Sequence, residues 1–300
     1  MSGTLAAAPA VLQTAFDYDT AFSRTIGWVT SAEQQQLRGK RVAIAGMGGV
    51  GGSHMLTLTR LGVQSFHVAD FDTFDIANMN RQAGAFQSTL GQPKVDVMTA
   101  MARDVNPALE VQRFAQGVTL ENLDEFLDGV DLYIDGLDFF VLGLRAAVFA
   151  RCAELGIPAI TAAPLGMGAA FLAFIPGQMT FEQYFRLEGQ SPDEQQLRFL
   201  VGLAPAALHQ TYLVDPSAVD IENRRGPSTP MSCQMCAGIA GTQALKILLG
   251  RGKVVAAPFG LHFDAYRNKL VRTWRPGGNN NPLQRLILSI ARRRFLGKRP

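Results

Sequence analysis

The sequence predicts an α/β fold: a doubly wound, Rossmann-like, mainly parallel sheet with an antiparallel C-terminal extension. Three observations support this prediction. A glycine-rich turn joins a short apolar run to a helix-like segment within residues 41–72, strand-like and helix-like segments then alternate as far as residue 163, and residues 259–274 have the pattern of a β-hairpin. Strands that alternate with helices at this spacing are typical of a parallel sheet covered on both faces.

Caps and apolar periodicity indicate where the elements of the first half begin and end. A helix is expected after a cap at Thr30 or Ser31, because hydroxyl side chains accept bonds from the first free N–H groups. Pro93 suits the first position of a later helix. In chain order, the expected elements are strand 42–45, helix 53–61, a strand that ends at Asp70, helix 94–105, strand 109–114, helix 119–127 capped by Thr119, strand 131–135, helix 140–155 and strand 159–163.

The pattern changes after residue 177. Residues 178–230 mix short helical pieces with Pro- and Gly-rich connections, which indicates a crossover segment or lid. A buried helix over 231–249 and the hairpin follow, then a GGNNNP linker at 277–282 and an amphipathic basic helix over 283–298. The apolar stretch 157–177 is broken by prolines and glycines, so it predicts two buried strands and no membrane span.

Composition and charge exclude several classes of protein. Three cysteines among 300 residues cannot form a secreted disulfide framework, and the N-terminus lacks the positive region of a signal peptide, so a cytoplasmic location is expected. Six of the 28 basic residues but none of the 25 acidic ones fall within 283–300, which leaves the rest with a net charge of −3. The tail can therefore contact an anionic membrane or RNA; a solvated terminus and docking on a partner subunit are the alternatives.

The segment 41–72 predicts a nucleotide site. Glycines are needed where the backbone turns tightly and approaches a phosphate, because a Cβ would block that approach. The free N–H groups at the start of the next helix then face the anion, and an acid at the end of the second strand is placed to hold ribose hydroxyls. The candidate nucleotide-binding residues are Gly46, Gly48, Gly49, Gly51, Asp70 and Asp72.

Charged residues outside the glycine turn distinguish between enzyme classes. Arg81 lies in a polar loop, Lys94 opens the next helix, Asp138 follows the fourth strand, and Arg24 lies in the N-terminal arm. Loops that follow parallel strands meet at one crevice, so the segments that carry Asp70, Arg81 and Asp138 should converge. Two cations and a carboxylate there predict ATP with Mg²⁺ held by Asp138, whereas a dehydrogenase has little need of them.

These motifs resemble those of the ThiF/MoeB/ubiquitin-activating-enzyme family. The resemblance rests on GMGGVGG, the acid in VADFD, NMNRQ, GQPK and DGLD, in this order, and covers residues 22–175. It implies an adenylyltransferase, a homodimer that uses ATP and Mg²⁺ to activate the C-terminal carboxylate of a ubiquitin-like or sulfur-carrier protein or peptide. It also implies one adenylating domain over 1–276 before the linker and tail at 277–300, with a nucleotide-binding core at 38–177, the crossover or lid at 178–230, and the closing helix and hairpin at 231–276.

The resemblance also implies roles for individual residues. Asp70 would hold the ribose and Asp138 would bind Mg²⁺, while Arg24 in FSRTI matches an N-terminal arginine that reaches the ATP of the partner subunit. The phosphates would be held by Asn78, Arg81 and Lys94. A carboxylate that attacks the α-phosphate needs no general base, so the protein contributes position and charge.

Some features depart from the family pattern. Phe139 follows DGLD where the family usually has Asn or Ser, which alters that side of the site. One CxxC pair, Cys233 and Cys236, supplies two of the four ligands of a zinc site, so no structural zinc is expected. Both thiols are interpreted as buried core residues rather than thioester nucleophiles. Arg145 is expected on a solvated helix face, and the alternative is a residue that supports the site from behind.

Three other functions stay open from the sequence. A tRNA threonylcarbamoyladenosine dehydratase-like enzyme is favoured by the basic tail and disfavoured by the acidic body. A nicotinamide-dependent oxidoreductase would leave Arg81, Lys94 and Asp138 without a role. A non-catalytic nucleotide-binding module is suggested by Phe139.

Overall fold

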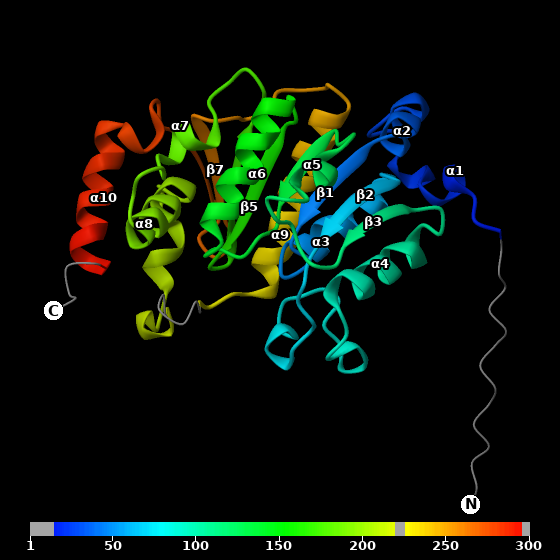
Figure 1. Ribbon diagram of the computed structural model, residues 1–300, viewed down its shortest axis with the longest axis horizontal. Helices are drawn as coiled ribbons and strands as arrows, with labels where there is room; N and C mark the ends of the chain where they lie inside the picture. The colour runs from blue at the N-terminus through cyan, green and yellow to red at the C-terminus, as the bar shows by residue number, and fades with distance from the viewer. Residues whose placement is uncertain (1–14, 220–225, 296–300) are drawn as a thin grey trace, which may run out of the picture.

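The computed structural model describes residues 15–219 and 226–295, and in it an eight-stranded sheet divides the molecule (Figure 1). The strands lie in the order β3-β2-β1-β4-β5-β6-β7-β8. Pairing is parallel from β3 to β5 and antiparallel from β5 to β8, so the predicted fold class is confirmed. The strands are β1 Arg41–Ala45, β2 Ser65–Ala69, β3 Glu110–Phe114, β4 Leu132–Asp135, β5 Ala159–Leu165, β6 Gly168–Phe174, β7 Phe259–Asp264 and β8 Lys269–Trp274.

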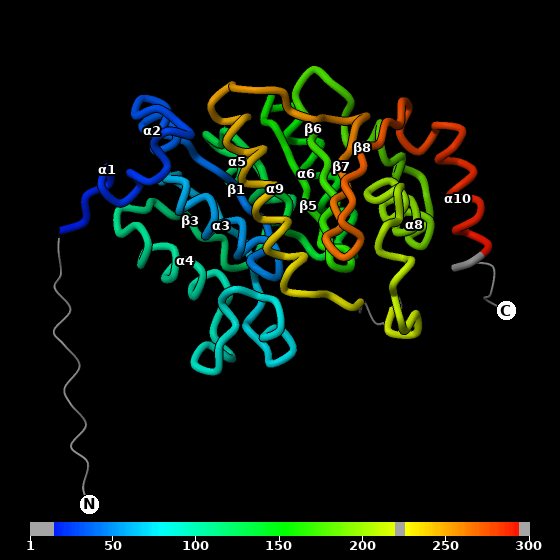
Figure 2. The backbone as a smooth tube through the Cα atoms, turned by 180° about the vertical axis from the view of Figure 1, so that it is seen from behind, coloured from blue at the N-terminus to red at the C-terminus, as the bar shows by residue number. Residues whose placement is uncertain are grey.

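Helices cover both faces of the sheet (Figures 1 and 2). One core joins the sheet to α3, α4 and α9, and the other joins it to α5, α6, α7 and α8. Strands covered on both sides have no solvated face, which explains the continuous apolar run of β4. The α-helices are α1 Tyr18–Ala21, α2 Ser31–Arg38, α3 Gly51–Arg60, α4 Lys94–Val105, α5 Leu123–Leu127, α6 Leu142–Leu155, α7 Phe181–Phe185, α8 Pro192–Leu203, α9 Pro230–Leu248 and α10 Pro282–Phe295.

Short 3₁₀ helices occupy several connections. They are η1 Ser23–Thr25, η2 Ile76–Asn78, η3 Gln87–Thr89, η4 Leu208–Tyr212, η5 Pro216–Ala218 and η6 Gly278–Asn280. Within 15–219 and 226–295, none of the helices combines the length and the apolar character needed to span a bilayer.

Local side-chain bonds decide where two helices begin. The cap at Thr30 is confirmed, since its hydroxyl accepts from the Glu33 N–H while the Glu33 carboxylate accepts from the Thr30 N–H. The prediction of a helix from Thr119 is wrong, because α5 begins only at Leu123. The side chain of Asn122 accepts from the Thr119 N–H and donates to the Gly117 carbonyl, which gives this segment an alternative to helical bonding.

The segment 277–282 is packed against the protein rather than being a freely exposed linker. Asn279 is buried, and its Nδ2 donates to the carbonyls of Phe185 at 2.7 Å and Arg198 at 3.0 Å. A Cβ at Gly278 would lie 2.1 Å from the Tyr184 carbonyl oxygen, so only glycine allows this approach. The segment therefore fixes the C-terminal helix to α7 and α8.

Pro282–Phe295 form α10, which docks on α8 of the same chain, and residues 296–298 of the predicted helix lie outside the described residues. Leu288 is buried against Leu197 and Val201. The Glu194 carboxylate accepts from Arg292 Nε at 2.8 Å and from Arg198 Nε at 2.7 Å. One face of α10 is therefore buried against α8, and the helix is not a solvated terminus.

Glu194→Gln tests this docking. Arg292 and then Arg198 hold the pKa of the Glu194 carboxyl below its ordinary value of 4.5, against the effect of burial. We expect the free energy of unfolding to fall by about 1–3 kcal/mol at neutral pH, because charge-assisted bonds are lost. Since the folded pKa is the lower one, this contribution is present above the ordinary value and is lost as the pH falls through the folded pKa.

Urea unfolding at pH 7 and at about pH 3 measures both effects. Glu154→Gln is the control, because Glu154 forms an exposed pair with Arg151 and should change stability by less than about 1 kcal/mol. An equal loss in the two variants would contradict the docking role.

Candidate functional site

The glycine turn after β1 packs against the loop after β4 at a distance that only glycines allow. A Cβ at Gly46 would lie 2.2 Å from the Gly136 carbonyl oxygen, and one at Gly51 would lie 1.7 Å from the Gly46 carbonyl oxygen. Gly46 also has a φ of +91°, which L side chains rarely adopt. These contacts join the carboxyl ends of β1 and β4 and direct the N-terminus of α3 toward the same edge.

Asp70 holds the glycine turn from the end of β2. Its Oδ2 accepts from the Met47 N–H at 2.6 Å, and its Oδ1 accepts from the Asp72 N–H at 2.8 Å. Burial raises the pKa of this carboxyl, and the two backbone bonds oppose that shift. Asp70 therefore positions the turn, and each of its oxygens keeps a second lone pair for a further donor.

Lys94 is buried at the start of α4 and pairs with Asp72. Its Nζ lies 2.9 Å from Asp72 Oδ2, and its side chain is 8% exposed against 53% for Asp72. The Lys94 N–H also donates to the Asp72 carbonyl. Thus Asp72 contacts the cation rather than standing alone as a nucleotide ligand.

The NMNRQ segment lies beside the glycine turn. Arg81 donates to the Ala77 carbonyl and to Asn80 Oδ1, and its Nε would lie 3.9 Å from a Cβ built on Gly49. Asn78 Oδ1 accepts from the Asp75 N–H, so this atom caps η2. The structure brings Arg81 to the turn and gives Asn78 a local role.

Gln82 lies beside the glycine turn, although the sequence did not predict it as a site residue. Its side chain is buried next to Gly48, where a Cβ would lie 3.6 Å from its Nε2. Gln82 Oε1 is buried without a hydrogen-bond partner. The signal was present in the NMNRQ motif, whose last residue is this glutamine.

Asp138 presents an exposed carboxylate on the loop after β4. Its Oδ1 accepts from the Phe140 N–H at 3.0 Å, and Oδ2 accepts no hydrogen bond from the residues that the structure describes. Among the described residues, no cluster of three or more His, Cys, Asp or Glu side chains is placed to hold a metal ion. A single carboxylate still fits Mg²⁺, because this ion takes one or two carboxylates together with phosphate oxygens.

Arg145 is buried, and the expectation of a solvated helix face is wrong. Its Nε forms an ion pair with Asp135 Oδ2 at 2.8 Å, and the two side chains are 3% and 2% exposed. Nη2 donates to the carbonyls of Leu137 at 2.6 Å and Asp138 at 3.1 Å, and Nη1 to that of Phe139 at 3.3 Å. One guanidinium therefore fixes the backbone of the loop that carries Asp138.

Phe139 points toward α8. Its ring packs against Phe199 at a centroid distance of 5.4 Å, and the Arg145 guanidinium lies 4.7 Å from the centre of the Phe199 ring. The departure from the family pattern at Phe139 thus ties the loop after β4 to the crossover segment.

Arg24 is exposed in η1 and is not brought to the glycine turn of its own chain. The hydroxyl of Tyr18, in the adjoining α1, donates to the carbonyl of Gly62, just before β2 begins. This N-terminal arm therefore lies at the amino edge of the parallel strands, opposite the edge that holds the glycine turn (Figure 1).

The cysteines are buried. Cys233 lies beside the turn, since a Cβ at Gly49 would be 3.3 Å from its Sγ. Burial raises the pKa of both the Cys233 and Cys236 thiols, which opposes the thiolate needed for a thioester. Both fit the interpretation as core residues.

Together these groups form a site suited to a nucleoside triphosphate. The first N–H groups of α3 have no partner within the helix and point at the carboxyl edge. Arg81 and Lys94 supply positive charge, and Asp138 supplies an exposed carboxylate. The absence of Cβ atoms at Gly46 and Gly51 makes room for the protein's own backbone, and this close approach sets the shape of the turn.

Removing the Arg145 guanidinium should destabilise the fold. Arg145→Met leaves the Asp135 charge buried and unpaired, so we expect the free energy of unfolding to fall by about 3–5 kcal/mol in urea titrations. Arg151→Met is the matched control on the same helix: its side chain is 34% exposed and its ion pairs are superficial, so less than about 1 kcal/mol is expected. A loss for Arg145→Met no larger than for the control would contradict the role of Arg145 in fixing the loop after β4.

Comparisons with known proteins show which family this chain resembles in sequence. The ThiF family profile matches residues 22–286. The tRNA threonylcarbamoyladenosine dehydratase of Bacillus subtilis is 40% identical over 107 residues, which cover 36% of this chain and 42% of that protein. The ubiquitin-like modifier-activating enzyme 5 of Bombyx mori is 35% identical over 96 residues, covering 31% and 24%. The matched segments thus span less than half of either relative.

Solved structures share the fold. The E. coli MccB structure with ATP has a TM-score of 0.61 at 18% identity and covers 81% of this chain and 65% of that one. The E. coli tRNA N6-threonylcarbamoyladenosine dehydratase TcdA has a TM-score of 0.57 at 21% identity, covering 77% and 95%. Because the family profile spans nearly all of the described chain, the protein belongs to the ThiF family.

Proposed function

We propose that this protein uses ATP and Mg²⁺ to adenylate the C-terminal carboxylate of a ubiquitin-like or sulfur-carrier protein or peptide. The observation that carries this proposal is the convergence of the glycine turn, Asp70, Arg81 and the Asp138 loop at one edge of the sheet. A nicotinamide-dependent oxidoreductase would use the turn and Asp70 but would leave the other two without a role.

The proposed reaction depends on position and charge. A carboxylate oxygen attacks the α-phosphorus, the bond from that phosphorus to the bridging oxygen breaks, and acyl adenylate and pyrophosphate form. The nucleophile is already ionised, so no proton has to be removed. Arg81 and Lys94 would stabilise the charge that develops on the phosphate oxygens, and Asp138 would hold Mg²⁺, which neutralises the leaving pyrophosphate.

The names of the relatives support a carboxylate-bearing partner. They include ubiquitin-like modifier-activating enzyme 5 and MccB, which was solved with MccA. We propose a homodimer, because Arg24 lies at the opposite edge from its own glycine turn and matches the family's trans-acting arginine. The three free cysteines agree with a reducing, cytoplasmic setting.

A second candidate is activation of a carboxylate on a modified tRNA nucleoside. The similarity to the Bacillus subtilis tRNA threonylcarbamoyladenosine dehydratase favours it. The net negative charge of residues 1–282 disfavours it, because tRNA binding needs a positive surface. Both candidates use the same adenylating chemistry and differ in the molecule that carries the carboxylate.

Asp138→Ala tests the proposed chemistry. We expect ATP–pyrophosphate exchange, measured with carrier-protein and peptide partners and with tRNA, to fall by about 10²-fold or more, because an electrostatic contact to the transition state is lost. Asp215→Ala is the control: Asp215 is also exposed, and its Oδ1 accepts an N–H two residues ahead at 2.9 Å. It should leave exchange unchanged.

The outcomes separate the candidates. Exchange that requires a carrier protein supports the first function, and exchange that requires tRNA supports the second. Retained exchange in Asp138→Ala, or full activity in Lys94→Ala, would contradict the mechanism. Binding of NAD in place of ATP would overturn both functions.

Mixing two inactive variants tests whether Arg24 acts across a dimer. Arg24→Ala and Asp138→Ala, combined after partial unfolding and refolding, should recover about one quarter of the wild-type exchange, because half of the dimers are mixed and each has one intact site. The unmixed variants provide the baseline. No recovery despite a demonstrated mixed dimer would show that Arg24 does not act in the partner's site.

A further inference from the structure

Helix α10 has a buried face and an exposed apolar face. On the buried face, Leu288 packs on α8 and Gln284 Nε2 donates to the Val201 carbonyl at 2.8 Å. On the other side, Leu283, Leu286 and Ile290 are 50%, 58% and 59% exposed. Spacings of three and four residues place these three side chains in one stripe along the helix.

Two exposed cations of α10 lie to one side of this stripe. Arg285 and Arg293 are exposed, and among the residues described no ion pair joins either of them to an acid, in contrast to the Arg292–Glu194 pair. No acidic residue occurs in the sequence from 283 to 300. The surface is thus both apolar and positively charged, which fits an anionic partner with an apolar layer beneath its charges.

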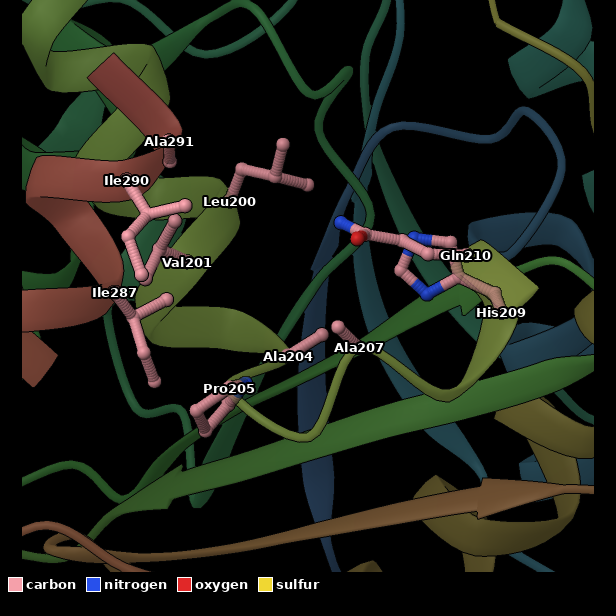
Figure 3. Close-up of a pocket in the computed structure, with 10 residues that line it drawn as sticks. All are labelled: Leu200, Val201, Ala204, Pro205, Ala207, His209, Gln210, Ile287, Ile290 and Ala291. Carbon is pink, nitrogen blue, oxygen red and sulfur yellow. The ribbon is translucent and has the colours of Figure 1, made fainter. Parts of the chain in front are cut away.

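The apolar surface continues into a groove between α10 and the α8–η4 segment (Figure 3). Ile287, Ile290 and Ala291 of α10 face Leu200, Ala204 and Pro205 across a cavity of about 110 Å³. Ile290 belongs to both surfaces, so the stripe and the groove are continuous.

The position of α10 leaves this surface accessible. The helix lies at one end of the long axis of the molecule, outside α8, while the glycine turn lies beyond several strands of the sheet (Figure 1). A flat partner can therefore contact α10 without covering the candidate site.

We propose that α10 binds the surface of an anionic lipid bilayer. Leu283, Leu286 and Ile290 enter the boundary between headgroups and acyl chains, and Arg285 and Arg293 contact lipid phosphates. RNA fits less well, because a strand is bound by cations with aromatic side chains that stack on bases, and exposed aliphatic side chains serve neither role. This interaction goes beyond the adenylating function and does not depend on it.

Vesicle flotation of the full chain tests the proposal without ATP. We expect binding to phosphatidylcholine vesicles that contain phosphatidylglycerol and much weaker binding to phosphatidylcholine alone. The double variant Leu286→Ser with Ile290→Ser should lower partitioning by at least about tenfold. Arg285→Gln and Arg293→Gln should each lower partitioning about fivefold. This loss should be smaller at high salt, because salt screens the attraction between arginine and lipid phosphate.

Leu270→Ser is the matched control, because Leu270 is 64% exposed on β8, away from α10. It should bind vesicles as the wild type does, and circular dichroism should show unchanged helix content in every variant. Absence of binding to the anionic vesicles, equal loss in Leu270→Ser, or binding that ignores Leu286 and Ile290 would overturn the proposal. So would tRNA binding tighter than vesicle binding and unaffected by the serine variants.

Discussion

The close approach of two backbone turns, one after β1 and one after β4, governs the arrangement of the candidate site. Gly46, Gly51 and Gly136 meet at distances where any Cβ would overlap a carbonyl oxygen or the backbone beside it. This contact requires parallel neighbouring strands that end at the same level, which the pairing of β1 with β4 provides. The helix N-terminus and the Asp138 loop are therefore placed together by backbone geometry before any functional side chain is considered.

The buried ion pair of Asp135 and Arg145 restricts the loop after β4, which the glycines allow to approach the turn but do not hold in place. Glycines permit close approach but leave a loop with wide conformational freedom. Arg145 restricts that freedom by binding three successive carbonyls from Leu137 to Phe139, and a buried carboxylate keeps the guanidinium in place. An arginine suits this task because its planar fork of five donors can satisfy several acceptors at once.

The sequence predicted the parts of the site that depend on local backbone requirements. Gly46 and Asp70 were identifiable because a tight turn and a strand-end acid have few alternatives. Arg145 was misplaced because helical periodicity defines faces but does not show which face a distant segment covers. Here Phe199 of the crossover segment packs over the guanidinium, a contact between residues far apart in the chain.

The same limit applies to the C-terminus. The composition of 277–282 indicated a linker, yet Asn279 satisfies carbonyls on two other helices. Polar residues are typical of linkers, but they also serve where a short turn must bond buried carbonyls. The difference lies in tertiary contacts that no local pattern encodes.

Asp138 illustrates how rigidity and exposure are combined at one residue. Its carbonyl accepts a hydrogen bond from Arg145, and its Oδ1 accepts one from the Phe140 N–H, so the position of the side chain is restricted. The carboxylate itself is exposed and therefore open to a cation from solvent. A fully buried carboxylate would bind its partner in place of a metal, as Asp135 binds Arg145, whereas a free surface carboxylate would lose conformational entropy on binding. Fixing the backbone while exposing the carboxylate avoids both costs, and this arrangement suits the metal-binding role that we propose for Asp138.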